Sequence, residues 1–87
     1  MKKKQRAPSY EYITPDDAAT VRARLDRNRL TQKWLIFRLD RDWGISVKSS
    51  QLSEILDGKR PLGPKTQRLI WCCLKIIEEY EKFYGGR

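Results

Sequence analysis

The spacing of apolar residues near the end of the chain is the sequence feature that most constrains the fold. Between residues 64 and 84, apolar side chains recur every three or four positions, which places them on one face of an α-helix roughly 30 Å long. Gly85 and Gly86 end the pattern. The residues on this face are Leu69, Ile70, Cys73, Leu74, Ile77, Tyr80 and Tyr84. A helix of this length is longer than a three-helix core needs.

A helix start signal precedes the first of three shorter helical patterns. Thr14 can cap the free amides, Pro15 suits the first helical position, and Asp16 and Asp17 favour the positive end of the helix dipole. The pattern predicts a helix from about Pro15 to Arg27. Its apolar positions, spaced by three and four, are Ala18, Val21 and Leu25.

Two more helices are expected before the long one. The second opens at residues 30–32, with a threonine near its cap, and ends around residues 40–42. Residues 43–46 form a predicted turn, because the glycine there permits a positive φ. The third helix starts at residues 48–51 and ends where Gly58 supplies a left-handed cap. The sequence therefore predicts an all-α fold of about four helices, the last at about 64–84.

The chain has little of the chemistry that catalysis or metal binding needs. It has 87 residues and no histidine, and its two cysteines, Cys72 and Cys73, are adjacent. That spacing offers neither a zinc site nor a loop-closing disulfide. We expect no metal, no cofactor and no enzymatic activity. On the last helix Cys73 is expected in the core and Cys72 as a partly exposed thiol.

The charge of the chain is strongly basic and unevenly distributed. Lys and Arg number 19 against 11 Asp and Glu, a formal net charge of +8. Residues 1–68 carry 16 basic and 8 acidic side chains, whereas residues 69–87 carry three of each. This distribution is expected if one end of the protein meets a polyanion such as nucleic acid, although a basic charge also serves solubility.

The opening segment is read as a separate unit. Residues 1–13 are expected to form a flexible basic arm and extended segment, and residues 14–87 the folded domain. The arm either reaches phosphates or a minor groove, or is a basic terminus without a role. It has no apolar signal segment and the chain has no run long enough to span a bilayer, so we expect a cytoplasmic protein.

The third predicted helix has an unusual polar face. Its apolar residues share one side, and the opposite side presents only short or hydrogen-bonding side chains: Ser49, Ser50, Ser53, Glu54 and Asp57. Exposed helix positions are usually filled by Lys, Glu, Ala or Gln, so this serine-rich face is atypical. A surface kept short and polar can approach another molecule closely.

Two segments together resemble a known DNA-binding motif. Residues 30–39 (LTQKWLIFRL) and 52–61 (LSEILDGKRP) are similar to the helix-turn-helix of the lambda-repressor-like (Cro and XRE) family, and the resemblance spans about residues 18 to 70. A Thr-Gln pair opens the second helix, an apolar-Ser-x-apolar segment lies in the third, and Gly-Lys ends it. The combination is more specific than any single element.

The resemblance implies roles for individual residues. In this family the third helix enters the major groove with its first residues at base edges, while the second crosses the backbone. The base-reading positions are Ser49, Ser50, Gln51 and Glu54. The phosphate-binding positions are Thr31, Gln32, Lys33, Lys48, Lys59 and Arg60. For Glu54 a solvated helix charge is the alternative, and for the basic residues ordinary loop solvation.

The sequence departs from the family pattern at the turn. About six extra residues, 40–45, lengthen the connection between the second and third helices. Ile36 stands where the family usually has a small Ala, which would hold the two helices further apart. Trp34 and Phe37 occupy positions that are usually polar, and we expect them in the core or against the last helix.

The last helix is apolar on more than one side, because Trp71, Ile76 and Phe83 lie off its main face. Either a second molecule covers it, or the residues before the first helix fold back onto it. The predicted homodimer interface on this helix is Leu69, Ile70, Cys73, Leu74, Ile77, Tyr80 and Tyr84.

The sequence favours one function over a second. The main hypothesis is a dimeric, sequence-specific double-stranded DNA-binding protein, of the kind that regulates transcription in phages or mobile elements; the phage assignment depends on the resemblance alone. The alternative is a helical protein-interaction module, adaptor or antirepressor-like, that keeps the fold without specific DNA reading. The lengthened turn and the acidic side chains of the third helix favour this alternative.

Overall fold

The computed structural model describes residues 13–85 as four α-helices and a final π-helical turn. The helices are α1 (Pro15–Arg27), α2 (Gln32–Trp43), α3 (Ser49–Leu56) and α4 (Pro64–Tyr80), and the turn is Glu81–Gly85. The described part contains no strand, and the predicted all-α fold with a long last helix is confirmed. Residues 1–12, most of the predicted arm, lie outside it. No helix in this range has the length and apolar character needed to cross a membrane.

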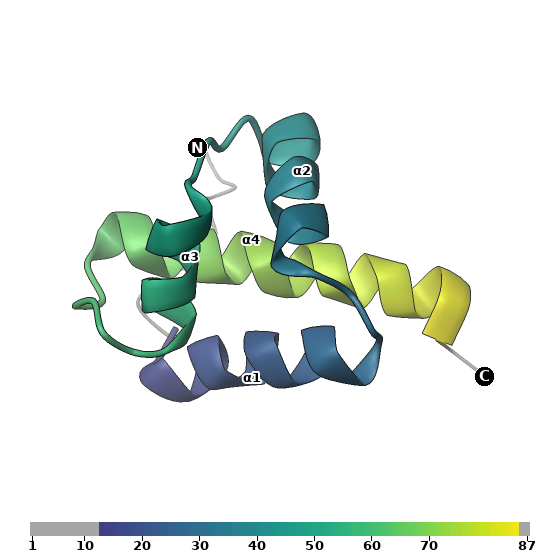
Figure 1. Cartoon of the computed structure of the whole chain (residues 1–87), viewed down its shortest axis with the longest axis horizontal. Coiled ribbons are helices and arrows are strands. Elements are labelled where there is room, and N and C mark those ends of the chain that lie inside the picture. The colour runs from purple at the N-terminus through teal and green to yellow at the C-terminus, as the bar shows by residue number, and fades with distance from the viewer. Residues whose placement is uncertain (1–12, 86–87) are drawn as a thin grey trace, which may run out of the picture.

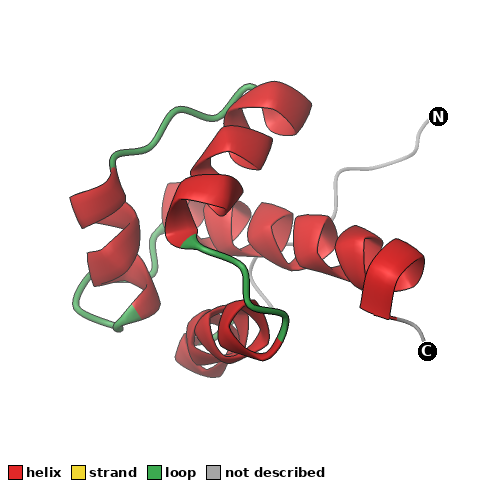
Figure 2. Cartoon of the chain, turned by 45° about the vertical axis from the view of Figure 1, so that its right-hand side comes forward, coloured by secondary structure: helices red, strands yellow, loops and turns green. Residues whose placement is uncertain are grey.

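The helix α4 is the axis of the fold. It spans the long dimension of the molecule, with α1 lying along one side of it and α2 and α3 on another (Figure 1). The helix α3 packs mainly against α1 and α2. A view turned by 45° shows the loop that joins α2 to α3 above α3 and the loop that joins α3 to α4 below it (Figure 2). Both loops therefore flank α3.

The helix boundaries follow from local capping. At α1 the backbone amide of Thr14 donates a 2.8 Å hydrogen bond to the Asp17 carboxylate. At α2 the Thr31 hydroxyl accepts from the backbone amide of Trp34 at 3.0 Å. Gly58, with φ of 77°, follows α3 as predicted. The predicted boundaries of α1 and α3 are confirmed.

The helix α2 ends one to three residues later than predicted. The helix continues through Trp43 and ends at Gly44, which has φ of 65°. Residues 40–43, which belong to the lengthened connection predicted from the sequence, are therefore helical. The link between α2 and α3 is residues 44–48. Gly44 supplies the left-handed C-cap that an L side chain adopts only with strain, so the helix ends there and not at the last apolar anchor, Leu39.

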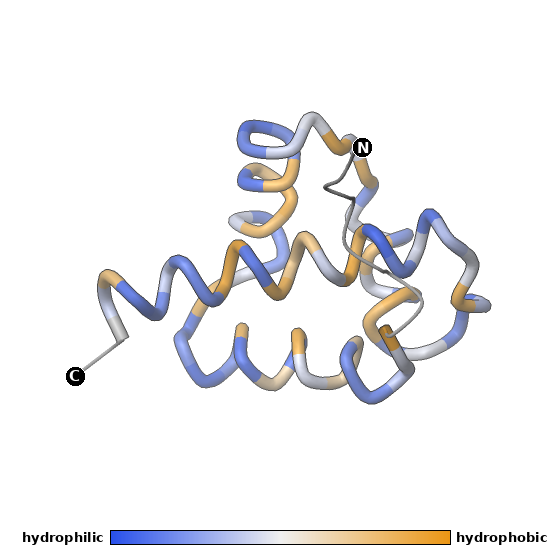
Figure 3. The backbone as a smooth tube through the Cα atoms, turned by 180° about the vertical axis from the view of Figure 1, so that it is seen from behind, coloured by the Kyte–Doolittle hydropathy of each residue, from blue (hydrophilic) through white to orange (hydrophobic). Residues whose placement is uncertain are grey.

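The core is built from one side of each helix. Along α1 the apolar positions lie mostly on the side of the helix nearer to α4 (Figure 3). The buried residues are Ile13, Ala18, Val21, Leu25, Leu35, Leu39, Leu52, Ile55, Leu56, Leu69, Ile70, Cys72, Cys73, Ile76 and Ile77. Ile13, assigned to the extended segment from the sequence, is thus part of the core. Its carbonyl accepts a 3.3 Å hydrogen bond from the Gln67 side chain, which ties it to α4.

The buried face of α4 is wider than its sequence pattern suggests. Cys72 and Ile76 are buried, although we expected Cys72 to be partly exposed and Ile76 to lie off the main face. Leu74 is only half-buried, and Tyr84 is 71% exposed. The physical reason is that α1 and α2 pack on two sides of α4 and together cover a broad sector. Burial raises the pKa of both thiols, so both cysteines stay protonated.

Glu81 fastens the end of α4 to the end of α1. Its carboxylate accepts from Arg24, from Arg27 at 3.1 Å and from the Asn28 amide at 2.8 Å. The hydrogen bond from Arg24 is the main reason that the pKa of Glu81 falls to about 2, and the bonds from Asn28 and Arg27 lower it further. This cluster fixes the last turn of the chain against α1.

Replacing Glu81 tests this contact. We expect Glu81→Gln to lower the free energy of unfolding by about 1 to 2 kcal/mol at neutral pH, because the charge-assisted bonds become neutral ones. A depressed pKa stabilises the fold only while the carboxyl is ionised. The difference between wild type and variant should therefore be complete above about pH 4.5 and shrink as pH falls toward 2.

Urea unfolding at a series of pH values measures that difference. Glu78→Gln is the control, because the Glu78 carboxylate lies 3.4 Å from Lys75 on an exposed surface and should change stability by less than about 0.5 kcal/mol. If the difference in unfolding free energy between wild type and Glu81→Gln stays constant down to about pH 2.5, the lowered pKa of Glu81 is contradicted.

Candidate nucleic-acid interface

The helix α3 presents its short polar side chains to solvent. Leu52, Ile55 and Leu56 are buried against α1 and α2, which turns the opposite face outward. Of the predicted base-reading residues, Ser49, Ser50 and Glu54 are exposed and Gln51 is half-buried. All four residues lie on this one short helix, and Ser49, Ser50 and Gln51 occupy its first turn.

The starts of α2 and α3 lie next to each other. The Gln32 amide nitrogen donates a 3.3 Å hydrogen bond to the backbone carbonyl of Ser49. Arg22 of α1 donates to the Gln32 amide oxygen at 3.4 Å. A residue predicted to bind phosphate thus contacts the first residue of the predicted recognition helix.

Arg22 holds the other end of α3. Its guanidinium lies 2.9 Å from the Asp57 carboxylate, at the end of α3, and donates a 3.5 Å hydrogen bond to the Ser53 carbonyl. Arg22 therefore links α1 to both ends of α3, through Gln32 and through Asp57. This role of Arg22 could not be predicted from the sequence, because the partners are far apart in the chain and no local spacing signals the contact.

Two residues with different predicted roles are paired with each other. The Arg60 guanidinium lies 2.9 Å from the Glu54 carboxylate, and both side chains are about half exposed. Ion pairs of this exposure contribute about 0 to 1 kcal/mol, so a phosphate can displace the carboxylate at little cost. The acidic side chains of α3 and its C-cap, Glu54 and Asp57, are both neutralised by arginines.

Unpaired cations gather around α3. Among residues 13–85, ion pairs engage six arginines and one lysine: Arg22, Arg24, Arg27, Arg38, Arg41, Arg60 and Lys75. The remaining basic side chains in this range have no ionic partner, and five of them lie in the loops that flank α3, the first turn of α2 or the first two turns of α4: Lys33, Lys48, Lys59, Lys65 and Arg68. Arg29 lies in the turn before α2 and Lys82 near the chain end. The exposed positive charge is therefore concentrated beside α3.

The predicted phosphate-binding residues are partly brought together. Lys48 is the N-cap residue of α3, Lys59 follows its C-terminus, and Lys33 is next to Gln32 at the start of α2; all three lysines are exposed. Thr31 caps α2 through its hydroxyl oxygen, so it has a structural role as well. Lys65 and Arg68 were not identified from the sequence; the only sequence signal that could have found them is that they are basic residues at the start of the last helix.

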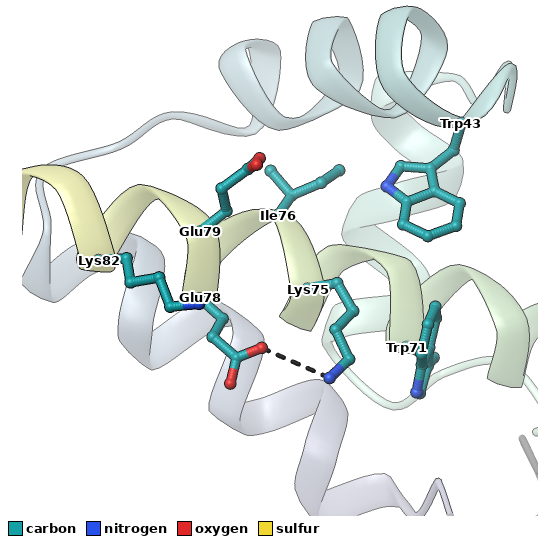
Figure 4. Close-up of a pocket in the computed structure, with 7 residues that line it drawn as sticks. All are labelled: Trp43, Trp71, Lys75, Ile76, Glu78, Glu79 and Lys82. Atoms are coloured by element: carbon teal, nitrogen blue, oxygen red, sulfur yellow. Dashed lines mark hydrogen bonds and ion pairs between the residues drawn. The ribbon is translucent and has the colours of Figure 1, made fainter. Parts of the chain in front are cut away.

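The aromatic residues lie away from this surface. Trp34 packs edge-on against Tyr80 with ring centroids 5.5 Å apart, which confirms its predicted contact with the last helix. Phe37 is 57% exposed, so its predicted burial is wrong: it lies on the outer side of α2, under the guanidinium of Arg41. Trp43 and Trp71 meet edge-on and line a shallow hollow with Lys75 and Glu78 (Figure 4).

The described residues contain no grouping of histidine, cysteine or carboxylate side chains that could hold a metal ion. Comparison of the chain with known protein families, with curated proteins and with solved structures found no match. The interpretation of the α3 surface therefore depends on its own contacts and charges.

Proposed function

We propose that the protein binds double-stranded DNA in a sequence-specific manner, with α3 in the major groove, as a transcriptional regulator of the phage or mobile-element type. The observation that carries this proposal is the set of unpaired cations around α3. Phosphate contacts supply most of the affinity of such proteins, and base contacts supply the specificity. The short side chains of α3 allow the helix backbone to approach base edges closely.

Each side of α3 has a distinct part in this arrangement. Ser49, Ser50, Gln51 and Glu54 face the bases. Lys48 and Lys59 lie before and after the helix and contact the two phosphate strands that border the groove. Lys33 and the α2 N-terminus make a further phosphate contact with one of these two DNA strands. Gln32 fixes the distance between α2 and α3 through its bond to Ser49.

Glu54 and Lys59 separate base reading from phosphate binding. Glu54→Ala should change the preferred sequence, because a carboxylate accepts a hydrogen bond from the cytosine amino group. Lys59→Ala should weaken binding to all duplexes alike and lower the slope of log affinity against log salt by about one. Fluorescence anisotropy on a preferred and a scrambled duplex measures both. Identical behaviour of the two variants on every sequence would remove α3 from base reading.

The proposal includes a homodimer. Its interface lies at the C-terminal end of the described residues, opposite the end of the molecule that holds residue 13 (Figure 1). Most of the interface expected from the sequence is unavailable, because Leu69, Ile70, Cys73 and Ile77 belong to the core of the monomer. What remains is the chain end, where Phe83 is 75% and Tyr84 71% exposed. The guanidinium and carboxylate groups near it are mostly paired, so two basic chains repel each other less here than across α3.

Selection from a random duplex library tests the function and the dimer together. An enriched site with two-fold symmetry, bound at least about a thousandfold tighter than a scramble near physiological salt, supports a dimeric regulator. An enriched site without symmetry supports specific binding by one copy. If no sequence is enriched and only salt-sensitive weak binding remains, the function is wrong, and the exposed aromatics then favour the protein-interaction module.

A further inference from the structure

A groove runs between α3 and the start of α4. It forms because α3 packs mainly against α1 and α2, which leaves its far side separate from the first two turns of α4. Three residues of the link from α2 to α3, Ile45, Ser46 and Val47, also line it. The polar residues that line it are Ser46, Gln51, Lys65, Thr66 and Arg68, and Ile45 is among the apolar ones.

The charge of this groove is uniformly positive. Lys65 and Arg68 are exposed, and within residues 13–85 they form no ion pair and donate no side-chain hydrogen bond. None of the described residues that line the groove is acidic. Elsewhere on the molecule arginines are held by carboxylates, for example Arg38 by Asp42 at 2.7 Å. Two cations left without a partner beside a recessed surface favour an anionic occupant.

The lining also matches the alternating chemistry of a nucleic-acid strand. Cationic, hydroxyl and amide groups from Lys65, Thr66 and Ser46 suit phosphate oxygens, which accept hydrogen bonds from such donors. The apolar part of the lining suits the less polar sugar. Gln51 lies in the same groove and on the base-reading helix, so a duplex that contacts α3 passes directly beside it.

We propose that this groove is a second backbone-binding site, in which Lys65 and Arg68 hold the sugar–phosphate strand of the duplex that α3 reads. The inference rests on the proposed DNA-binding function and adds contacts that neither the helix-turn-helix segment nor its flanking loops supply. Gln51 then joins the two sites, because it borders both the bases and this strand. The occupant is a phosphodiester backbone and not a free anion, because the groove continues the surface of α3.

The test is a double variant with a matched control. Lys65→Ala with Arg68→Ala should lower the salt slope by about two, which corresponds to a loss on the order of 30-fold in affinity at about 0.15 M salt, equally for preferred and scrambled duplexes. Lys75→Ala with Lys82→Ala removes the same charge from the far part of α4 and should change affinity by less than about threefold. Melting curves should be unchanged for both, because all four side chains are exposed.

Neutral methylphosphonate substitutions then locate the strand. With the wild-type protein, each contacted phosphate that is neutralised should weaken binding. For the Lys65 and Arg68 double variant, neutralising at least one of these phosphates should cause no further loss of affinity; such a phosphate is called silent. The silent phosphates of this variant should differ from those of a Lys48→Ala, Lys59→Ala variant. Coincident sets, or no silent phosphate, would overturn the second site.

The outcomes separate the inference from the function. If wild type selects a sequence and the double variant behaves like its control, the groove is not a backbone site and the function stands. If wild type enriches no sequence but the double variant still lowers the salt slope by about two, the groove binds backbone and the specific function fails. If wild type binds no duplex, both are wrong.

Discussion

Leu52→Ala should lower the free energy of unfolding by about 2 to 5 kcal/mol. Leu52 is fully buried on α3 and, with Ile55 and Leu56, packs against α1 and α2. Truncation removes apolar contact and leaves a cavity that the short, eight-residue helix fills only by moving. A domain of this size has a total stability of about 4 to 13 kcal/mol, so the expected loss is a large part of the total.

Urea unfolding followed by circular dichroism measures the loss, and the midpoint should fall by at least about 1 M. Ser50→Ala is the control on the same helix, because Ser50 is exposed and its replacement should change stability by less than about 0.5 kcal/mol. A cost below about 1 kcal/mol for Leu52→Ala would mean that α3 is not packed on the body of the protein. The α3 surface would then not be held rigidly enough to contact DNA bases in a fixed geometry.

The elements that the sequence predicted well are those with local causes. Thr14 and Thr31 cap helices through bonds to residues three positions away, and Gly58 ends α3 through its own backbone conformation. Such signals lie within a few residues, so they can be recognised without knowing the rest of the fold. The all-α class and the four helices follow from them and from the apolar spacing.

The failures concern features that tertiary packing decides. Cys72 is buried because α1 and α2 pack on two sides of α4. Phe37 is exposed because nothing in the described fold covers the outer side of α2. No spacing rule distinguishes a helix face that meets one neighbour from a face that meets two. The last one to three residues of α2 likewise depend on Gly44, which was assigned to the turn but not as the helix cap.

The candidate site divides in the same way. The short polar face of α3 is visible in the sequence, since Ser49, Ser50 and Glu54 follow from helical periodicity alone. The contacts of Arg22 with Gln32 and Asp57, by contrast, join three helices, and sequence patterns carry no information about them. Which cations remain unpaired is also a property of the folded molecule, so Lys65 and Arg68 emerge only from the structure.

A charge change at the start of α3 should separate DNA binding from stability most sharply. Ser49→Glu with Ser50→Glu places two carboxylates where the proposal puts base edges and phosphates. We expect affinity for the selected duplex to fall at least about a hundredfold, because each lost base contact costs about 1 to 3 kcal/mol and the new charges repel the backbone. Anisotropy titration at fixed salt measures the loss.

The same substitution should leave the fold intact or stabilise it. These are the first two positions of α3, whose first turn has no acidic residue and whose N-cap provides no side-chain hydrogen bond. Acidic side chains there interact favourably with the helix dipole, by about 0.3 to 1 kcal/mol each. Ala19→Glu with Ala23→Glu on exposed positions of α1 makes the same change in net charge and should reduce DNA affinity by less than about fivefold. Equal losses for the two double variants would show that only total charge matters, which would move DNA contact away from α3.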